Sequence, residues 1–313
     1  MKQKIKIYFT DFWKGFDVND NIFTRRLAPY YDLEVTPEAD YLFYSFYGNK
    51  HLNYPDAIKI YFTGENDVPD FNFCDYGIGF QHITFEDRYL RFPLYLLYEE
   101  YAKLSTKKVL SSDLTNRKFC NFVYSNANHS SPIREEFFCK LLKYKKVDSG
   151  GRLLNNIGGP VADKLEFIKD YKFTIAFENS SVSGYTTEKI MQPMTVNSLP
   201  IYWGSKSVDK DFNIKSFIDV QSFSSMEQAI EEIIRLDNDN EAYIKMLSEP
   251  WQTEEQRSID WEGNLIKFLD NIFSQPKEEA RRTTIYGFVG RQKYREKKFA
   301  TLADIPIIRK IFN

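Results

Sequence analysis

The sequence predicts an α/β protein built from two Rossmann-like domains that face a cleft. Short runs of β-branched and aromatic residues alternate with helix-like stretches, as is typical of parallel sheets. The alternation occurs twice, on either side of a polar, linker-like stretch at residues 104–118. The length of 313 residues suits two domains of medium size. Ligands of open parallel sheets bind beyond the carboxyl ends of the strands, so polar clusters at such ends are the candidates for a site.

The first domain is assigned to residues 1–115. Its strands are recognised as apolar runs bounded by polar residues, and the last of them ends in a glycine turn, Thr63–Asn66. The later segments 71–80 and 86–96 are interpreted mainly as packing. Strands are predicted at residues 4–9, 32–36, 40–48 and 57–66, with a short helix at residues 21–31.

The second domain is assigned to residues 116–275 and repeats the pattern. The run 171–177, YKFTIAF, is predicted to be a buried strand, and residues 251–275 are predicted to be wholly helical. Other strands are predicted at residues 120–126, 146–149, 198–203 and 217–223, and other helices at residues 131–145, 166–170, 186–196 and 225–238. A polar cluster lies at the carboxyl end of four of these predicted strands. The clusters are TGEN at 63–66, SGGR at 149–152, FENSS at 177–181 and YWGS at 202–205.

The composition excludes several classes of protein. The net charge of −2 argues against general nucleic-acid binding. Cys74, Cys120 and Cys139 are widely spaced, which indicates neither a disulfide framework nor a zinc site. The N-terminus lacks the apolar region of a signal peptide, and no apolar run is long enough to span a bilayer. We therefore expect a cytoplasmic protein.

A cation at a helix N-terminus is the first candidate for a binding site. The helix at 186–196 is predicted to begin with a cap at Thr186 or Thr187, followed by Glu188 and Lys189. A lysine there faces the positive end of the helix macrodipole, which suggests that an anion binds from outside. The alternative, equally compatible with this segment, is that Lys189 extends into solvent and pairs with a surface carboxylate.

Arg152 supports the anion interpretation. It follows two glycines after a predicted strand, so its guanidinium could bind a phosphate through two hydrogen bonds. No Walker A or G-x-G-x-x-G sequence is present. The combination fits a nucleotide diphosphate that is held by cations and helix ends.

Glu65 is the candidate general base of the first domain. It stands just beyond a strand end, where a carboxylate could deprotonate a hydroxyl nucleophile. The alternative is a turn carboxylate in water, which is the commoner case for a single glutamate.

Short acidic candidates for a metal site occur at Asp17–Asp20 and Asp237–Glu241. The second resembles the solvated end of a helix, and the site is interpreted as independent of metal.

These residues together resemble the α-1,3-fucosyltransferases of glycosyltransferase family 10, particularly the bacterial enzymes. The resemblance covers most of residues 58–220, and the run FENS…GYTTEKI…PIYWGS is highly specific. The segments that carry it, in the order and spacing of the family, are residues 61–80, 87–96, 122–128, 172–190 and 199–220.

The resemblance implies a GT-B fold with an N-terminal acceptor domain and a C-terminal GDP-fucose domain. It implies inverting transfer from GDP-β-L-fucose to the 3-hydroxyl of an N-acetylglucosamine unit in N-acetyllactosamine-type glycans, with no metal or other cofactor. Glu65 matches the base of the family. Residues matching its donor site are Arg152, Asn179, Tyr185, Glu188 and Lys189, of which Glu188 matches a carboxylate near the ribose or fucose and is also a catalytic candidate.

Other functions remain open from sequence. The regiochemistry could extend to α-1,4 linkage on type 1 acceptors, or the chain could be a catalytically silent glycan-binding GT-B protein. The sequence lacks the C-terminal heptads of some bacterial relatives and the anchor and stem of animal Golgi relatives, so a bacterial cytoplasmic enzyme acting on lipopolysaccharide is expected.

The tail at residues 276–313 is basic with interleaved aromatics. It is either a solvated, partly disordered segment or an attachment to an anionic membrane surface.

Overall fold

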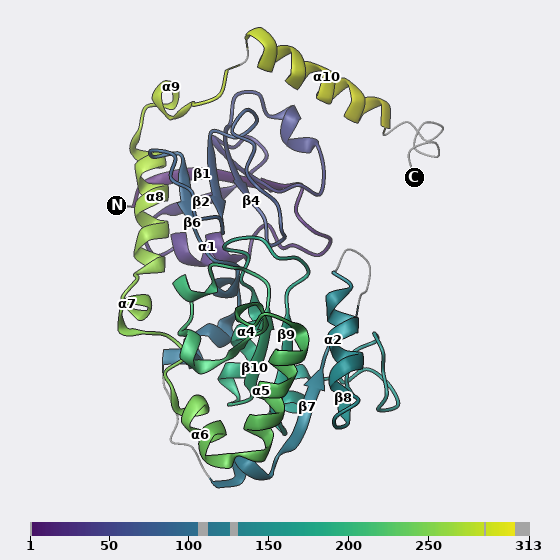
Figure 1. Cartoon of the computed structure of the whole chain (residues 1–313). Helices are drawn as coiled ribbons and strands as arrows, with labels where there is room; N and C mark the ends of the chain where they lie inside the picture. The colour runs from purple at the N-terminus through teal and green to yellow at the C-terminus, as the bar shows by residue number, and fades with distance from the viewer. Residues whose placement is uncertain (1, 106–111, 126–130, 285, 304–313) are drawn as a thin grey trace. The chain divides into compact units, whose positions relative to one another are not determined.

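The computed structural model describes residues 2–105, 112–125, 131–284 and 286–303 (Figure 1). The chain forms two compact units. Unit 1 consists of Met1–Phe92 together with Asp260–Asn313, and unit 2 is the continuous segment Pro93–Ile259. Each unit is built around its own parallel sheet, which confirms the α/β class and the two Rossmann-like domains.

The sheet of unit 1 has six strands in the order β2-β1-β3-β4-β5-β6, and all neighbours pair in parallel. Alternate residues of β1 point into the core, where Ile5, Ile7 and Phe9 are buried, whereas β4 is buried along its whole length. The strands are β1 (Lys4–Thr10), β2 (Asp32–Val35), β3 (Tyr41–Tyr44), β4 (Ile58–Phe62), β5 (Tyr76–Gly79) and β6 (Tyr89–Arg91).

Helices of unit 1 come from both ends of the chain. The short α1 (Ile22–Leu27) begins at Asn21, whose side chain caps it, and η1 (Lys50–Asn53) connects β3 to β4. The C-terminal part supplies α8 (Trp261–Ser274), α9 (Lys277–Ala280) and α10 (Gly287–Ala303).

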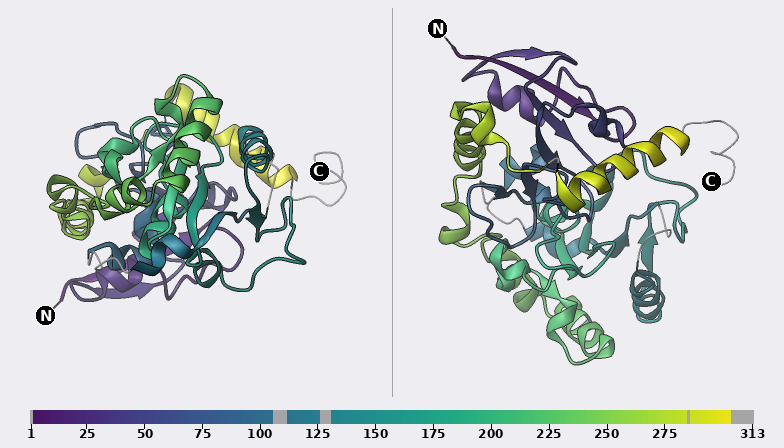
Figure 2. Two further views of the ribbon diagram at one scale, coloured as in Figure 1. Left: turned by 60° about the horizontal axis from the view of Figure 1, so that its bottom comes forward. Right: turned by 90° about the horizontal axis from the view of Figure 1, so that it is seen from above.

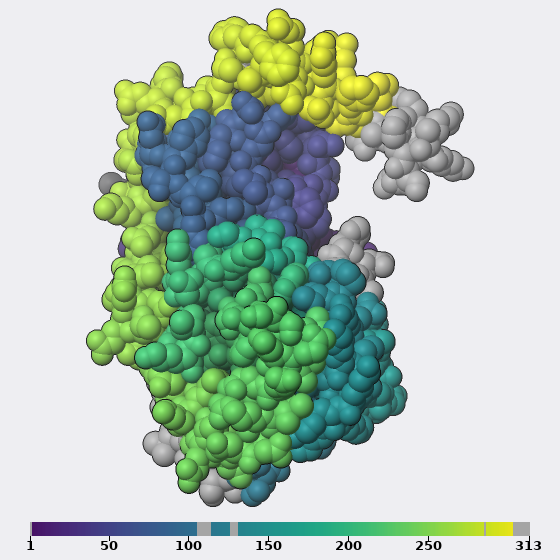
Figure 3. Space-filling model, viewed as in Figure 1, coloured from purple at the N-terminus to yellow at the C-terminus, as the bar shows by residue number. Residues whose placement is uncertain are grey.

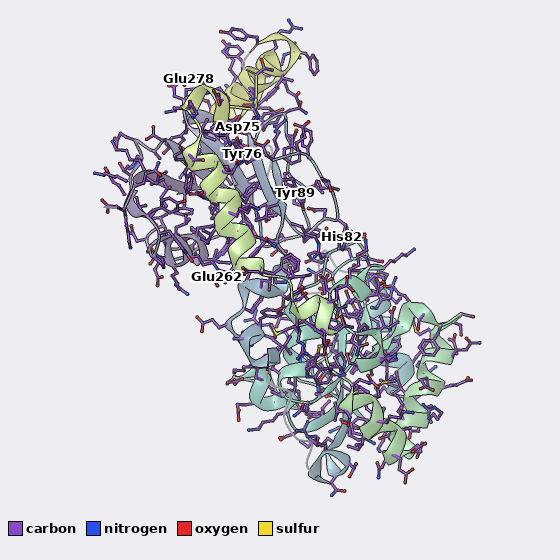
Figure 4. All side chains as sticks on the ribbon, turned by 90° about the vertical axis from the view of Figure 1, so that its left-hand side faces the viewer. Asp75, Tyr76, His82, Tyr89, Glu262 and Glu278 are labelled. Atoms are coloured by element: carbon purple, nitrogen blue, oxygen red, sulfur yellow. The ribbon has the colours of Figure 1, made fainter. Side chains whose placement is uncertain are left out.

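Helix α8 packs on unit 1 through an apolar stripe. Leu265, Leu269, Ile272 and Phe273 recur at helical spacing and are buried. The Phe273 ring lies 4.5 Å from that of Tyr41. Figure 2 shows α8 beside the strands of unit 1, and Figure 4 shows Tyr76 near the carboxyl end of this helix.

The sheet of unit 2 has five strands in the order β11-β10-β9-β7-β8, again all parallel. Its central strand, β9 (Tyr171–Phe177), is buried along its whole length because helices cover both faces of such a sheet. The other strands are β7 (Lys118–Phe122), β8 (Val147–Ser149), β10 (Leu199–Trp203) and β11 (Ile218–Asp219).

The α-helices of unit 2 surround this sheet. They are α2 (Ile133–Leu141), α3 (Lys164–Ile168), α4 (Glu188–Thr195), α5 (Met226–Asn238), α6 (Asn240–Ser248) and α7 (Glu254–Arg257). The short 3₁₀ helices η2 (Leu94–Leu97), η3 (Glu99–Ser105) and η4 (Ser112–Asn116) precede β7 in the chain. Helix α4 packs against η3, β9 and β10, which places its first turn beside the ends of both strands.

The structure corrects two expectations about secondary structure. Segments 71–80 and 86–96 contain two strands, β5 and β6, in addition to packing residues. The segment 251–275 is two helices, α7 and α8, because Asp260 caps the second one and interrupts the first. The division by contacts also differs from boundaries at 115/116 and 275/276: residues 93–115 belong to unit 2, and α8 belongs to unit 1.

The C-terminal tail is ordered over its first part. Asp75 accepts hydrogen bonds from the backbone amides of Arg282 and Thr283, at 2.8 and 2.7 Å, and Arg282 also pairs with Asp87 at 2.5 Å. Helix α10 follows. The described tail residues up to 303 are therefore solvated, as the first interpretation expects, but they include a folded helix with mostly exposed side chains. Within the described chain, no helix combines the length and the apolar character needed to cross a membrane.

Candidate functional site

Three polar clusters meet at one edge of the unit 2 sheet. Residues 150–152 follow β8, residues 178–181 follow β9 and residues 204–205 follow β10. The carboxyl ends of parallel strands lie on the same side, so these clusters share the edge at which such sheets bind ligands. The fourth cluster, residues 63–66, follows β4 in unit 1, as predicted.

A tight loop carries the chain from β9 to α4. The Glu178 amide donates to the Trp203 carbonyl at 2.8 Å, which ties the end of β9 to β10. Gly184 has φ +83°, a left-handed conformation that favours glycine, and its amide donates to Ser205 Oγ at 2.8 Å. This turn folds the chain back, so that the start of α4 lies against the end of β9.

Glu178 is the fully buried centre of this arrangement. Its Oε1 accepts from the Thr187 amide at 2.8 Å, and its Oε2 accepts from Thr187 Oγ1 at 2.8 Å. Thr187 in turn caps α4, so of the two predicted caps this is the one used. A Cβ on Gly204 would lie 2.5 Å from Glu178 Cγ, so glycine at 204 gives the glutamate its space.

Lys189 lies between two carboxylates. Its Nζ is 3.4 Å from Glu178 Oε2, 3.2 Å from Glu188 Oε1 and 3.1 Å from Thr187 Oγ1. The lysine side chain is 16% exposed and Glu178 is not exposed at all, so this is not a surface pair. The alternative of a solvent-directed Lys189 is therefore wrong.

The charges of this cluster are strongly coupled. Burial raises the pKa of Glu178, and the nearby Lys189 only partly opposes this effect. For Glu188, burial acts in the same direction, but Lys189 and Lys164 outweigh it and lower the pKa to about 2. Burial alone would lower the pKa of Lys189, yet Glu178 and Glu188 hold it above its usual value. Glu188 and Lys189 are thus both charged at neutral pH.

A second layer of side chains supports α4. Lys164 Nζ donates to Gln192 Oε1 at 2.8 Å, and Gln192 Nε2 donates to Glu100 Oε1 at 3.2 Å. The Tyr98 hydroxyl is hydrogen-bonded to Glu188, and burial together with this carboxylate raises the pKa of the phenol. Residues from segment 93–105 therefore complete the surroundings of α4.

Asn179 is oriented by a buried arginine. Arg134 donates to Asn179 Oδ1 and to the Phe177 carbonyl, both at 3.0 Å, and its guanidinium lies 3.9 Å from the centre of the Tyr124 ring. Tyr185, another predicted donor-site residue, is buried beside Lys189. Asn179, Tyr185, Glu188 and Lys189 thus belong to one cluster around the start of α4.

Arg152 stands in the loop that follows β8. Its side chain is exposed, while the preceding Gly151 lies so close to Tyr124 that a Cβ there would be 1.8 Å from the Tyr124 carbonyl oxygen. Asn155 fixes the loop by donating to the Ser149 and Gly151 carbonyls, at 3.0 and 2.7 Å. Arg152 therefore extends from an anchored loop at the same edge of the sheet.

Glu65 lies in unit 1 and is exposed. Its amide donates to Thr63 Oγ1 at 3.1 Å, and its Oε1 accepts from the Tyr47 hydroxyl at 3.5 Å. Partial burial and this carboxylate raise the pKa of Tyr47 to about 12, so Tyr47 is protonated and can donate. The carboxylate is held in a turn but open to a substrate.

Sequence reasoning did not identify Glu178, Arg134, Lys164 and Tyr98 as site residues. Glu178 carried a signal, as a glutamate directly after a buried strand. The other three had none, because they contact the cluster only through the tertiary fold.

The acidic segment at Asp237–Glu241 includes the end of α5, and residues 238–241 are exposed, as expected of a solvated helix end; the side chain of Asp237 is the exception. Asp237 is buried and accepts from Lys172 Nζ at 2.9 Å, from Lys145 Nζ at 3.0 Å and from the Tyr144 hydroxyl at 3.0 Å. It is a structural ion-pair residue. In the described part of the chain, no three His, Cys, Asp or Glu side chains group as metal ligands would.

Two family models match the chain. The model of the alpha-(1,3)-fucosyltransferase FucT N-terminal domain matches residues 7–98, and that of the glycosyltransferase family 10 (fucosyltransferase) C-terminal region matches residues 114–276. Among curated proteins, the chain is 39% identical over 271 residues to the alpha-(1,3)-fucosyltransferase FucT of Helicobacter pylori, covering 76% of this chain and 56% of that protein. The chain thus spans little more than half the length of this relative.

Solved structures agree with these matches. A crystal structure of an alpha1,3-fucosyltransferase is 31% identical and aligns over 88% of this chain and 92% of the other, with a TM-score of 0.77. The same comparison with an alpha1,3-fucosyltransferase bound to GDP-fucose gives a TM-score of 0.76. Anabaena HepE in complex with UDP-glucose, only 10% identical, shares the fold with a TM-score of 0.54. The architecture is that of GT-B glycosyltransferases.

Proposed function

Because the chain belongs to glycosyltransferase family 10, the fucosyltransferases, we propose that it is an inverting α-1,3-fucosyltransferase. It moves L-fucose from GDP-β-L-fucose to the 3-hydroxyl of N-acetylglucosamine in an N-acetyllactosamine-type glycan. The product is of the Lewis x type, and lipopolysaccharide is the proposed carrier. The relatives named as alpha-(1,3)-fucosyltransferases support the linkage, and the related structure with GDP-fucose supports the donor.

The observation that carries this proposal is the position of Lys189. It stands in the first turn of α4, at the carboxyl edge of the unit 2 sheet, with its ammonium fixed between Glu178 and Glu188. A charge that is already oriented needs no reorganisation when a phosphate arrives or leaves. The helix N-terminus adds partial positive charge of its own.

On the donor side, Lys189 and Arg152 are proposed to bind the diphosphate of GDP-fucose. Asn179 and Tyr185 are proposed to line the phosphate region, and Glu188 to accept hydrogen bonds from the ribose or fucose hydroxyls. The exposed Arg152 suits a role in which a flexible guanidinium closes on a charged ligand. The low pKa of Glu188, about 2, keeps it an acceptor at neutral pH.

On the acceptor side, Glu65 is proposed as the general base. It takes the proton of the 3-hydroxyl as the oxygen forms a bond to the anomeric carbon of fucose, while the bond from that carbon to the diphosphate oxygen breaks. GDP leaves with the electron pair, and its charge is compensated by Lys189 and Arg152. One such displacement inverts the anomeric configuration, from β in the donor to α in the product.

We further propose that transfer needs no metal ion. Two cations, Lys189 and Arg152, stand at the edge where the diphosphate is proposed to bind, and they can supply the charge that a divalent ion supplies elsewhere. EDTA in the assay tests this directly: loss of activity in EDTA and recovery with added Mg²⁺ or Mn²⁺ would contradict it.

The decisive experiment mixes the protein with GDP-fucose, EDTA and three acceptors in separate reactions: N-acetyllactosamine, its type 1 isomer and lactose. Product linkage is determined by NMR. We expect an α-1,3 bond to N-acetylglucosamine of N-acetyllactosamine. An α-1,4 product on the type 1 acceptor would instead establish the broader α-1,3/4 activity. GDP binding without transfer to any acceptor would favour a silent glycan-binding protein.

The tail is proposed to associate with the surface of an anionic membrane. In α10, Phe288 and Phe299 are 70% and 65% exposed, and a helical repeat of 3.6 residues puts them on one side together with Arg291 and Arg295. Exposed aromatics flanked by arginines are typical of helices that lie in a membrane interface. Figure 3 shows α10 as a surface ridge at the end of unit 1.

A further inference from the structure

A cavity of about 400 Å³ lies within unit 1, between the loop after β3 and helix α10. Its volume is in the range of small-ligand sites, which is roughly 300–1,000 Å³. Tyr47, Asn49 and Asn53 line one side, and Lys297, Ala300 and Thr301 of α10 line the other. The tail helix is thus one wall of the cavity, and α10 packs directly against η1.

The floor of this cavity is rigidly built. Asp11 has φ +59°, which is costly for a residue other than glycine. Its carboxylate accepts from the Lys50 amide at 3.0 Å, from the His51 amide at 2.8 Å and is 2.8 Å from His51 Nδ1. A Cβ on Gly48 would lie 2.5 Å from Asp11 Oδ1. Strain of this kind is found where a site must be held in one shape.

The cavity is adjacent to the proposed base. Tyr47 lines the cavity with its ring, and its hydroxyl donates to Glu65 Oε1 at 3.5 Å. The Tyr47 ring stacks on Phe46 at 4.2 Å and lies 6.4 Å from Trp13, and all three rings are more than a third exposed. A half-open aromatic group next to a carboxylate offers the apolar surface on which a sugar ring packs.

The chemistry of the walls indicates a saccharide. Asn49 and Asn53 each carry an amide donor and acceptor, Thr301 adds a hydroxyl, and Lys50 and Lys297 add donors. Amides, hydroxyls and ammonium groups around an aromatic ring suit a ligand that has many hydroxyls and one apolar face. The Asp11 carboxylate already accepts hydrogen bonds from the loop, so the polar groups available to a ligand are mainly the amides, the hydroxyl and the lysines.

Resting on the proposed function, we propose that this cavity binds a further sugar of the acceptor glycan, beyond the N-acetyllactosamine unit that receives fucose. Helix α10 completes the subsite. The tail therefore determines which acceptors are used, in addition to any association with membranes. The geometry of the helix allows both roles: Lys297, Ala300 and Thr301 recur at i, i+3 and i+4 and form one face, whereas Phe288 and Phe299 lie on the opposite one.

The test compares a short and a long acceptor, N-acetyllactosamine and the tetrasaccharide lacto-N-neotetraose. The measured quantity is the ratio of kcat/KM, long over short, in the full chain. We expect a ratio well above one. We expect Ala300→Trp, which fills the cavity, and a chain ending at Tyr286, which removes α10, to lower this ratio at least tenfold, mainly through the KM of the tetrasaccharide.

Lys298→Trp is the matched control. It adds the same indole about 200° away around α10 from Ala300, where its side chain is exposed, and we expect it to keep the ratio of the full chain. An unchanged ratio in both Ala300→Trp and the shortened chain would overturn the proposal. So would an equal fall in Lys298→Trp, which would indicate general damage to the helix.

A binding measurement separates this proposal from the proposed function. Saturation-transfer NMR reports which sugars of the tetrasaccharide contact the protein, whether or not fucose is transferred. If no acceptor is fucosylated but the flanking sugar contacts the full chain and not Ala300→Trp, the function is wrong and the subsite stands. If transfer occurs and the flanking sugar shows no contact in the full chain, the subsite is wrong and the function stands.

Discussion

At the scale of single residues, Lys189 shows both the strength and the limit of reading the sequence. A lysine in the first turn of a helix predicts an unusual electrostatic environment, because the macrodipole disfavours a cation there. The reason inferred for it was an external anion. The structure shows two nearer anions as well, since Glu178 and Glu188 lie 3.4 and 3.2 Å from the ammonium of Lys189. Glu178 is eleven residues away, and only the turn at Gly184 brings the two together, so the pair could not be read from local sequence.

Replacing Lys189 by alanine should weaken the donor side of the reaction. A hydrogen bond to a charged group contributes about 1.5–3 kcal/mol, so at least a tenfold rise in the GDP-fucose Kd is expected, together with slower transfer. Isothermal titration with GDP and steady-state kinetics measure the two effects. Lys297→Ala, which removes a lysine from unit 1, is the control and should leave GDP affinity unchanged. An unaltered donor KM and kcat would remove Lys189 from the site.

Replacing Glu65 by glutamine should affect the chemical step only. A general base contributes about 10²–10⁴-fold, and the amide keeps the shape of the side chain while losing its basicity. We expect kcat to fall by that factor while the Kd for GDP stays within about twofold. Turnover at the wild-type rate would show that another group accepts the proton of the acceptor hydroxyl.

Glu188 should make stability depend on pH in a defined window. Its pKa in the folded chain is about 2, below the ordinary 4.5, although burial opposes the shift, because Lys189 and Lys164 favour the charged form. A carboxyl group whose pKa is lowered on folding stabilises the folded state at pH values above 4.5. This stabilisation is lost as the pH falls from 4.5 towards 2. The full shift of the pKa corresponds to a free energy of about 3 kcal/mol. Urea unfolding of Glu188→Gln and wild type should therefore differ most at neutral pH and converge near pH 2–3. A constant difference would contradict this assignment.

At the scale of helices and strands, the parallel sheets and polar strand ends were predictable because period and composition are local properties. The strands β5 and β6 were missed for the same reason. β5 reads YGIG, where two glycines weaken the strand pattern, and β6 has only three residues. Gly77 and Gly79 are needed because a Cβ would lie 2.7 Å from Pro69 and 2.6 Å from Gln81 Oε1. Tight contacts with residues outside the strand thus require glycine at positions 77 and 79.

Helix α10 should bind anionic membranes through its outer face. Each Lys or Arg near such a surface contributes about 1 kcal/mol, and the exposed Phe288 and Phe299 add apolar contact. We expect sedimentation with phosphatidylserine-containing vesicles for the full chain and much less for Phe288→Ser/Phe299→Ser. Vesicles of phosphatidylcholine alone are the control for charge. Equal sedimentation of the two proteins would end the membrane proposal.

At the scale of the whole molecule, the two domains were predictable, but the segments that pack together in each compact unit were not. The polar stretch at 104–118 resembled a linker, yet its first residues belong to η3, which packs against α4 and supplies Glu100, the partner of Gln192. The segment 251–275 was predicted to be helical, but its sequence does not indicate which sheet α8 covers. That choice is made by partners such as Tyr31, whose hydroxyl donates to Asp270 at 2.5 Å.

The contact-based division makes a testable statement about independent folding. A fragment of residues 93–259 contains all of unit 2 and should fold and bind GDP by itself. A fragment of residues 116–275 lacks η3 and carries α8 without its sheet, so it should be less stable and prone to aggregate. Circular dichroism melting and GDP titration of the two fragments decide this. A higher melting temperature and tighter GDP binding of the 116–275 fragment would contradict the division by contacts.

Unit 1 is assembled from both ends of the chain, and this has a consequence for synthesis on the ribosome. Unit 2 is contiguous and can complete its sheet while later residues are still being added. The strands of unit 1 are made first, yet α8, which buries part of their apolar surface, follows more than 160 residues later. The N-terminal part of unit 1 is therefore synthesised first but keeps part of its apolar surface exposed until α8 has been synthesised. We expect the nascent chain to depend on chaperones until α8 emerges from the ribosome.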